Sequence, residues 1–326
     1  MAAVTSSRIP GIHHITAICG DPQTNLDFYV GVLGLRPVKK TVNFDDPGSY
    51  HLYYGDGLGS PGTIMTFFAW MLPPLASGRG RQGTGQVGAT PFLIPEASLD
   101  FWTDRLAADA IDFDGPEMGF GESVITLTDL DGLPLELIAR PGGAVREVWQ
   151  QSPVPVEHAI RGFAGATLCL DGYERTAALL TETMGFREAG QEGSRFRFEA
   201  GEGDDIAMID LLCQPENEPG RTGTGAVHHI AWRTTTDDAQ QEWRRVLVET
   251  GLGVTPVLDR MYFRSIYFRE PGGVLFEIAT DPPGFTVDET SEDLGTELKL
   301  PPWLEPRRER LEARLPALRA SGHVRS

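Results

Sequence analysis

Gly11-Ile12-His13-His14-Ile15-Thr16 and Ala226-Val227-His228-His229-Ile230-Ala231 are two copies of one short pattern in this chain of 326 residues. Each copy places two histidines inside a run of β-branched and apolar residues, which predicts a β-strand. Successive side chains of a strand point to opposite faces, so each doublet offers one histidine to a given cavity. The two copies therefore predict two histidine ligands, not four.

A carboxylate interrupts a third apolar strand, in Pro271-Gly272-Gly273-Val274-Leu275-Phe276-Glu277-Ile278. Two histidines and one carboxylate that leave positions open on the metal are the ligand set of non-haem Fe(II) oxygenases. The sequence thus predicts a metal site, provided that the chain brings its three strands together.

The residues that share a strand face indicate which histidine of each doublet is the ligand. The second histidine shares its face with small or hydroxylated side chains and the first with isoleucine; the neighbours are Thr16, Val227 and Ala231 for the second, and Ile15 and Ile230 for the first. Large aliphatic side chains favour the core, while small ones leave room for a metal and a substrate. We therefore predict His14, His229 and Glu277 as the metal ligands.

One β-α-β-β-β order repeats four times along the chain, at a period of roughly 60–75 residues. Start signals such as Asp21 and Pro22, and stop signals such as Gly34, predict the helices at residues 22–33, 99–106, 173–184 and 239–249. Four such modules predict an α+β fold of two open β-barrels. We predict a first domain of two modules at residues 9–150 and a second domain of two modules at residues 163–285. A junction at residues 151–162 joins them, and residues 286–326 form a C-terminal extension.

The way in which the modules pair decides whether the ligands meet. If neighbouring modules pair, His14 shares a site with Glu136, and His229 shares another with Glu277, so that each site lacks a ligand. If the first module packs against the fourth, His14, His229 and Glu277 converge. We therefore predict that the first and last modules build the working barrel, and that Glu136 is a solvated or hydrogen-bonded residue without metal.

Composition excludes several functions. The formal net charge of −18 argues against nucleic acid and anionic membranes as partners. No apolar run is long enough to cross a bilayer, and the N-terminal residues lack the pattern of a signal peptide, so we expect a cytoplasmic protein. The three cysteines lack CxxC spacing and are expected to be free thiols, which excludes a zinc knuckle and a disulfide framework.

These features resemble the vicinal oxygen chelate superfamily of glyoxalases, bleomycin-resistance proteins and extradiol dioxygenases. The resemblance rests on the four modules, the two doublets and the turn-plus-strand segments 131–137 and 271–277. Within the superfamily, residues 9–300 are similar to ring-cleaving dioxygenases of the hydroquinone 1,2-dioxygenase type. Further matching segments are residues 50–56, 157–163 and 283–286.

The resemblance implies an Fe(II)-dependent ring-cleaving dioxygenase of the extradiol or hydroquinone type. Its substrates would be O2 and a hydroquinone-like or catechol-like aromatic, with both oxygen atoms inserted. Mn(II) in place of Fe(II) and assembly into a homo-oligomer are left open. A metal-dependent lyase or isomerase of the glyoxalase kind, and a non-enzymatic binding protein, are the alternatives; the former commonly uses four protein ligands, whereas three are visible here.

The resemblance also implies five side chains that line or support the pocket: His13, Thr16, His228, Arg260 and Tyr267. Arg260 would neutralise negative charge that develops during the reaction, and Tyr267 would donate a hydrogen bond to substrate or oxygen. A surface ion pair with Asp259 is the alternative for Arg260, and purely structural roles are the alternative for His13 and His228.

Two features outside this set have simpler interpretations. His51 and His158 are expected to be packing residues or to support the ligands from behind. The run Leu304–Leu318, which carries four arginines, is expected to form a solvated helix or an oligomer contact.

Overall fold

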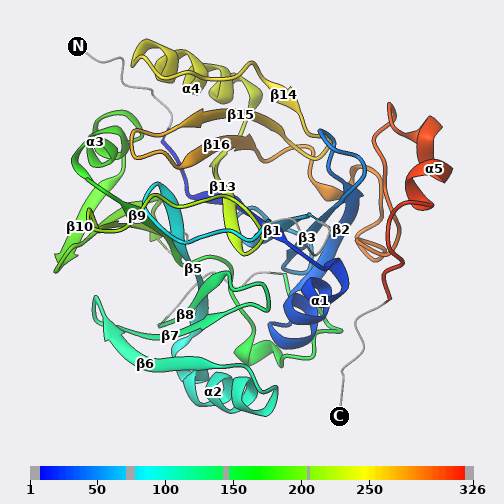
Figure 1. Ribbon diagram of the computed structural model, residues 1–326, viewed down its shortest axis with the longest axis horizontal. Helices are drawn as coiled ribbons and strands as arrows, with labels where there is room; N and C mark the ends of the chain where they lie inside the picture. The colour runs from blue at the N-terminus through cyan, green and yellow to red at the C-terminus, as the bar shows by residue number, and fades with distance from the viewer. Residues whose placement is uncertain (1–7, 71–77, 142–146, 204–205, 320–326) are drawn as a thin grey trace.

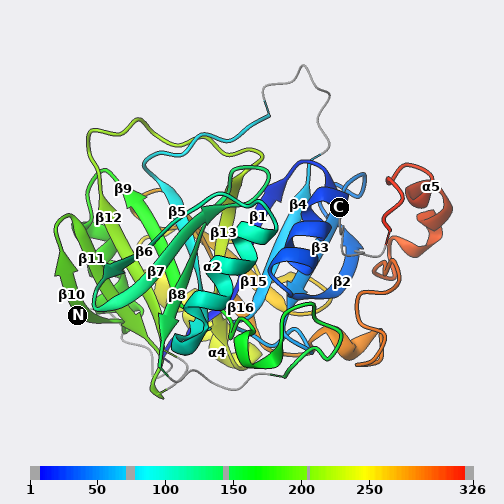
Figure 2. The same cartoon turned by 90° about the horizontal axis from the view of Figure 1, so that it is seen from below.

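The computed structural model describes residues 8–70, 78–141, 147–203 and 206–319. Its strands form two eight-stranded sheets, and Figures 1 and 2 show each of them curling into an open barrel. The predicted α+β fold of β-α-β-β-β modules is confirmed. Within the described ranges, no helix is both long and apolar enough to cross a membrane.

Each module contributes four strands. In chain order they are β1 (Ile12–Cys19), β2 (Arg36–Val42), β3 (Tyr50–Gly55) and β4 (Ile64–Ala69); β5 (Gln86–Pro95), β6 (Phe113–Gly119), β7 (Glu122–Thr128) and β8 (Pro134–Arg140); β9 (Gly165–Leu170), β10 (Arg187–Glu192), β11 (Arg195–Ala200) and β12 (Ala207–Cys213); and β13 (Ala226–Thr234), β14 (Leu258–Asp259), β15 (Arg264–Arg269) and β16 (Leu275–Thr280). The sequence pattern does not reveal β6, β10 and β14. The edge strands β6 and β10 are largely exposed and carry no apolar alternation, and β14 is only two residues long.

The helices lie where the sequence predicts them, but two of them change type. They are α1 (Pro22–Leu26), α2 (Leu99–Ala108), α3 (Glu174–Ala178) and α4 (Asp237–Glu249). A π-helix continues α1 over Asp27–Val32 and α3 over Leu179–Thr183. In the first, the amide of Leu33 donates to the carbonyl of Phe28, five residues earlier, at 3.1 Å. Helical periodicity does not distinguish this wider turn from an α-helix.

The sheets pair the modules as the ligand argument requires. The first sheet has the order β14-β15-β16-β13-β1-β4-β3-β2 and joins modules one and four, while the second has the order β10-β11-β12-β9-β5-β8-β7-β6 and joins modules three and two. The predicted pairing of the first with the last module is confirmed. The ranges 9–150 and 163–285 do not coincide with the sheets, because each sheet takes one module from each range; as domain limits they stay a prediction.

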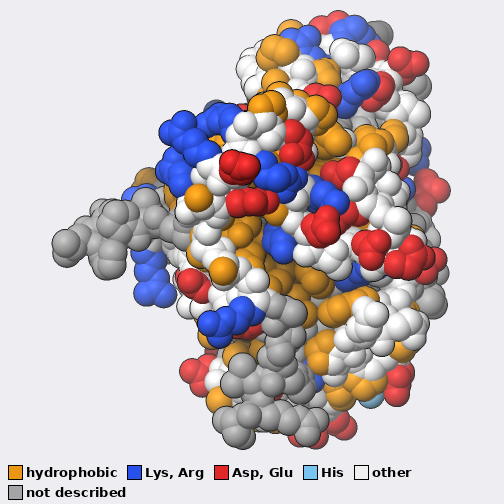
Figure 3. Space-filling model, turned by 90° about the vertical axis from the view of Figure 1, so that its right-hand side faces the viewer, with side chains coloured by type: hydrophobic (Ala, Val, Ile, Leu, Met, Phe, Trp, Pro, Cys, Tyr) orange, Lys and Arg blue, Asp and Glu red, His pale blue; other side chains and the backbone are white. Residues whose placement is uncertain are grey.

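The C-terminal extension packs against the first module. Within residues 286–319 only the short α5 (Arg308–Glu312) is α-helical, so the expected solvated helix over Leu304–Leu318 is wrong in extent. The side chains of Leu304, Leu311 and Leu315 are buried, and the hydroxyl of Tyr50 donates to the carbonyl of Pro316 at 2.9 Å. Figure 3 shows this face of the molecule, on which acidic and basic side chains lie beside one another around apolar ones.

Candidate metal centre and pocket

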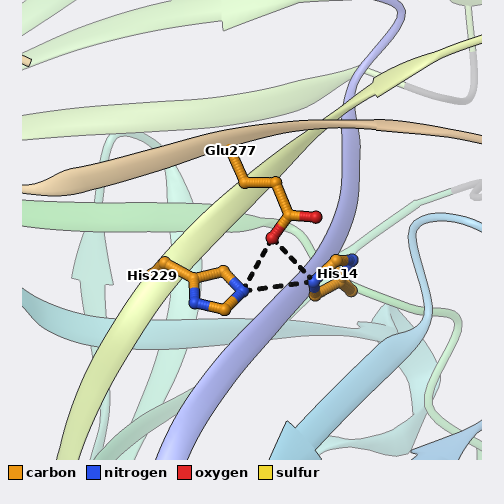
Figure 4. Close-up of side chains that lie close together, drawn as sticks. All are labelled: His14, His229 and Glu277. Carbon is orange, nitrogen blue, oxygen red and sulfur yellow. Dashed lines mark hydrogen bonds and ion pairs between the residues drawn. The ribbon is translucent and has the colours of Figure 1, made fainter. Parts of the chain in front are cut away.

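Three neighbouring strands of the first sheet, β16, β13 and β1, carry the predicted ligands. Ala231 in β13 pairs with Glu277 of β16 on one side and with His14 of β1 on the other. His229 lies two residues from Ala231 and therefore on the same face, opposite Thr16. Figure 4 shows that the side chains of His14, His229 and Glu277 point toward one another from these three strands.

The ligand atoms converge on one point. Oε2 of Glu277 lies 2.9 Å from Nε2 of His229 and 3.4 Å from Nε2 of His14, and the two nitrogens are 3.3 Å apart. All three side chains are buried. Ligand atoms that each lie about 2.1 Å from one ion, at right angles, are about 3 Å from one another. The observed separations therefore fit one face of an octahedral metal site.

Neighbouring side chains orient the three ligands. The hydroxyl of Ser265 donates to Oε1 of Glu277, which leaves Oε2 for the two imidazoles. The two Nδ1 atoms of His13 and His14 are 3.0 Å apart, and those of His228 and His229 are 2.8 Å apart. If each ligand keeps its ring proton on Nδ1 and donates it to the preceding histidine, both Nε2 lone pairs face Glu277.

The electrostatics favour a cation over protons at this point. Burial lowers the pKa of His229, and burial together with His229 lowers the pKa of His228 to about 3, so both rings are neutral near pH 7. Burial alone would raise the pKa of Glu277, but His14 and His229 hold it well below its usual value. Oε2 of Glu277 is buried and has no hydrogen-bond donor among the described residues. Two imidazole lone pairs and an orphaned carboxylate oxygen fit a divalent metal ion.

A cavity of about 370 Å³ opens beside the triad. Aromatic and apolar side chains form much of its wall: Phe44, Phe68, Trp70, Phe263, Leu258 and Leu275. Of the five predicted pocket residues, Thr16, His228, Arg260 and Tyr267 line this cavity. His13 does not line it, because its side chain lies behind His14 and packs against Phe263, with ring centroids 5.2 Å apart.

Arg260 lies at the pocket, not in the ion pair with Asp259 that the sequence left open. Its Nη1 contacts Asp45 at 3.1 Å, and its Nε donates to the hydroxyl of Tyr267 at 3.3 Å. Burial works against the charge, but Tyr267 and Asp45 raise the pKa of Arg260, so the guanidinium stays protonated. Tyr267 pairs with Glu277 across β15 and β16, as its position before that strand predicts.

Sequence reasoning missed the aromatic wall of the cavity and also His51 and Tyr53, which lie on β3 and line the cavity. The sequence did carry a signal: the segment Tyr50-His51-Leu52-Tyr53 alternates polar with apolar positions, so residues 51 and 53 share one face. His158 does not line this cavity; its ring stacks on Phe101 of α2 with ring centroids 4.2 Å apart, in agreement with a packing role.

The second sheet lacks the ligands at the same register. There Glu136 takes the place of Glu277, but Ala89 stands where His229 stands and Gly165 where His14 stands. Nη2 of Arg195 lies 3.4 Å from Oε1 of Glu136, within a cavity of about 610 Å³. The carboxylate of Glu136 thus lies beside a guanidinium, one of the hydrogen-bonded environments expected for it.

Comparison with known proteins identifies the family and its named relatives. The model of the glyoxalase/bleomycin resistance protein/dioxygenase superfamily matches residues 11–137 and 162–278. A Bacillus subtilis protein named "Putative ring-cleaving dioxygenase MhqO" is 48% identical over 307 residues, which cover 94% of this chain and 96% of that protein.

Two further relatives extend the comparison to a named substrate and to a solved structure. The chlorohydroquinone/hydroquinone 1,2-dioxygenase of Sphingobium indicum is 36% identical over 306 residues, or 91% of this chain and 93% of that protein. The crystal structure of a dioxygenase from Bacillus subtilis, titled as putative, superposes with a TM-score of 0.91 at 47% identity, covering 97% of this chain and 99% of that one.

Proposed function

Because the chain belongs to the glyoxalase/bleomycin resistance protein/dioxygenase superfamily, we propose that it is a ring-cleaving dioxygenase that opens a hydroquinone-like or catechol-like aromatic with O2. The observation that carries this proposal is the buried triad of His14, His229 and Glu277, whose open side faces a cavity with aromatic walls. The name of the Sphingobium indicum relative, at 36% identity over nearly the whole chain, supports hydroquinones as the substrate class.

The triad would hold Fe(II), or Mn(II) in its place. Bound Fe(II) supplies electron transfer to O2 and positions at which O2 and a substrate oxygen meet. Three protein ligands, not four, keep those positions free. This ligand count favours an oxygenase over the glyoxalase-type lyase or isomerase that the sequence left as an alternative.

The remaining pocket residues would bind and orient the aromatic. Phe44, Phe68 and Phe263 offer apolar contact to a planar ring. The guanidinium of Arg260 places a fixed positive charge beside the pocket, where it would stabilise an anionic oxygen of the substrate. Burial raises the pKa of Tyr267, so its phenol stays protonated and is able to donate a hydrogen bond. His228 is neutral and half-buried at the pocket; with its Nδ1 accepting from His229, its Nε2 carries the ring proton and would donate a hydrogen bond to a substrate oxygen.

We predict stoichiometric O2 uptake when the protein, loaded anaerobically with Fe(II), is mixed with hydroquinone or a substituted hydroquinone. The product should have the composition of substrate plus O2, because a dioxygenase inserts both atoms and needs no external reductant. An oxygen electrode and mass spectrometry with ¹⁸O2 measure both quantities, and the product isomer identifies which ring bond is cleaved. Catechol serves as the second substrate class.

The outcome separates this proposal from its alternatives. Absence of O2 uptake with every hydroquinone and catechol, by protein shown to contain Fe(II), would refute the dioxygenase. Consumption of a thiol adduct of an α-oxoaldehyde without O2 would instead indicate the lyase or isomerase. Tight binding of an aromatic that is independent of metal, without turnover, would indicate a binding protein.

A further inference from the structure

A chain of four hydrogen-bonding side chains runs behind and beside the pocket, on β3, β4 and β1. The hydroxyl of Tyr53 lies 2.9 Å from Nδ1 of His51, and Nε2 of the same ring lies 2.7 Å from Oγ1 of Thr66. Oγ1 of Thr66 lies 3.1 Å from Oγ1 of Thr16. Tyr53, His51 and Thr16 line the cavity, whereas Thr66 is completely buried behind it.

The direction of the hydrogen bond between Thr66 and Thr16 determines where the protons lie along this row of four side chains. The phenol of Tyr53 is buried, and within the described ranges its hydroxyl has one hydrogen-bond partner, Nδ1 of His51. Oγ1 of Thr66 donates to Oγ1 of Thr16 and therefore accepts from Nε2 of His51, so that Nδ1 of the neutral ring accepts from the hydroxyl of Tyr53. His51 then carries its proton on Nε2 and donates it to Thr66, provided that the ring is neutral. Burial, reinforced by His14 and His229, lowers the pKa of His51 well below its usual value, which agrees with a neutral ring.

The order of donors continues to the metal side of the pocket. Oγ1 of Thr66 accepts from His51, so the hydroxyl proton of Thr66 is free to go to Thr16. Oγ1 of Thr16 therefore acts as an acceptor toward Thr66, and its own proton has no acceptor among the described residues. Thr16 is opposite His229 in the strand pairing and lines the cavity, so this proton points to where a substrate would lie.

We propose that Tyr53, His51 and Thr66 are positioning residues that fix the hydroxyl of Thr16 as a hydrogen-bond donor to an oxygen of the bound aromatic. A donor at this point favours an oxygen that has lost its proton, because hydrogen bonds to charged acceptors are the stronger ones. This row of hydrogen bonds thus favours binding of the phenolate form of the substrate over the neutral phenol. This inference rests on the proposed function only for the identity of the ligand.

The test uses 4-nitrophenol as a probe, because its neutral and ionised forms absorb at different wavelengths. The probe is titrated into the metal-loaded protein under nitrogen, and the fraction bound as phenolate is followed from pH 5 to pH 9, a range of about four units around neutrality. Thr66→Val removes the donor to Thr16 at nearly constant shape, while Thr66→Ser keeps a hydroxyl. His51→Leu and His51→Gln form the second pair, because glutamine retains an Nε2 donor.

We expect Thr66→Val and His51→Leu to weaken phenolate binding about tenfold relative to the wild type, because the hydroxyl of Thr16 would no longer be held as a donor and most of its hydrogen bond to the charged oxygen would be lost. The affinity of Thr66→Ser and His51→Gln for the phenolate should stay within about twofold of the wild type, because each variant keeps a donor toward the next side chain. A purely structural role would affect neutral and ionised probe alike. Circular dichroism and thermal unfolding establish that each variant folds.

The result distinguishes this inference from the proposed function. Equal phenolate binding by the wild type, Thr66→Val and Thr66→Ser overturns the inference, and so does equal loss in both Thr66 variants. Neither outcome tests the proposed dioxygenase activity, which is measured separately as O2 uptake with hydroquinone. Conversely, the expected binding differences without O2 uptake by the wild type would uphold the hydrogen-bond chain and refute the dioxygenase.

Discussion

Replacing Glu277 with alanine is expected to lower the affinity for Fe(II) by more than about a hundredfold, and to abolish O2 uptake with hydroquinone. Mutation of a residue that merely hydrogen-bonds to a metal ligand typically lowers metal affinity or activity by about 10- to 100-fold. Here one of the three proposed ligands would itself be lost, and with it the carboxylate that contacts both imidazoles. Metal content after anaerobic loading and desalting measures the affinity, and an oxygen electrode measures the activity.

The second sheet supplies a matched control for this prediction. Glu136 occupies the same register as Glu277 but pairs with Arg195, so Glu136→Ala should leave metal content and O2 uptake unchanged. Thermal unfolding of both variants separates loss of metal from loss of fold. Full metal content in the Glu277→Ala protein, or equal losses in both variants, would show that the triad is not the metal site.

Replacing Lys39 with alanine is expected to destabilise the protein by about 3–5 kcal/mol, the usual cost of removing one partner of a buried ion pair. The side chain of Lys39 is completely buried. Its Nζ contacts the carboxylates of Asp288 and Glu289 and donates to the carbonyl of Phe285 at 3.1 Å. Without the ammonium group, two carboxylates would stay close together with no cation beside them. Urea unfolding, followed by circular dichroism, measures the change in free energy.

The neighbouring lysine is the control for that measurement. Lys40 is half-buried and donates to the carbonyl of Thr296, so Lys40→Ala should cost no more than about 1 kcal/mol. Lys39→Met retains most of the apolar volume and should be as destabilising as Lys39→Ala if the lost charge is the cause. Equal free energies of unfolding for the Lys39→Ala and Lys40→Ala proteins would contradict a stabilising role for this ion cluster.

The sequence alone predicted which histidine of each doublet faces the site, from the alternation of side chains along a strand. In a regular strand alternate side chains share a face, which distinguished His14 and His229 from His13 and His228. The prediction that each doublet offers one histidine to a cavity is wrong for the second doublet, because the register of β1 and β13 shifts between His229 and Val227 and His228 lines the same cavity as His229. The four modules were visible because helical and strand periodicities differ. The comparison of possible ligand sets then indicated that the first module had to meet the fourth, since no other pairing joins two histidines and an acid.

Only the tertiary structure decided what each of these side chains contacts. Arg260 bonds to Tyr267 and Asp45 and not to Asp259, and Ser265 holds one oxygen of Glu277. Local sequence cannot reveal such partners, because parity gives the direction of a side chain but not the strand that lies beside it. His51 and Thr66 are fifteen residues apart, and Lys39 and Asp288 are 249 apart, and in each case the contact exists because the sheet closes around the pocket or the extension folds back on β2. The pattern of single strands thus sufficed to propose the three ligands, whereas the hydrogen bonds around them depend on the packing between strands.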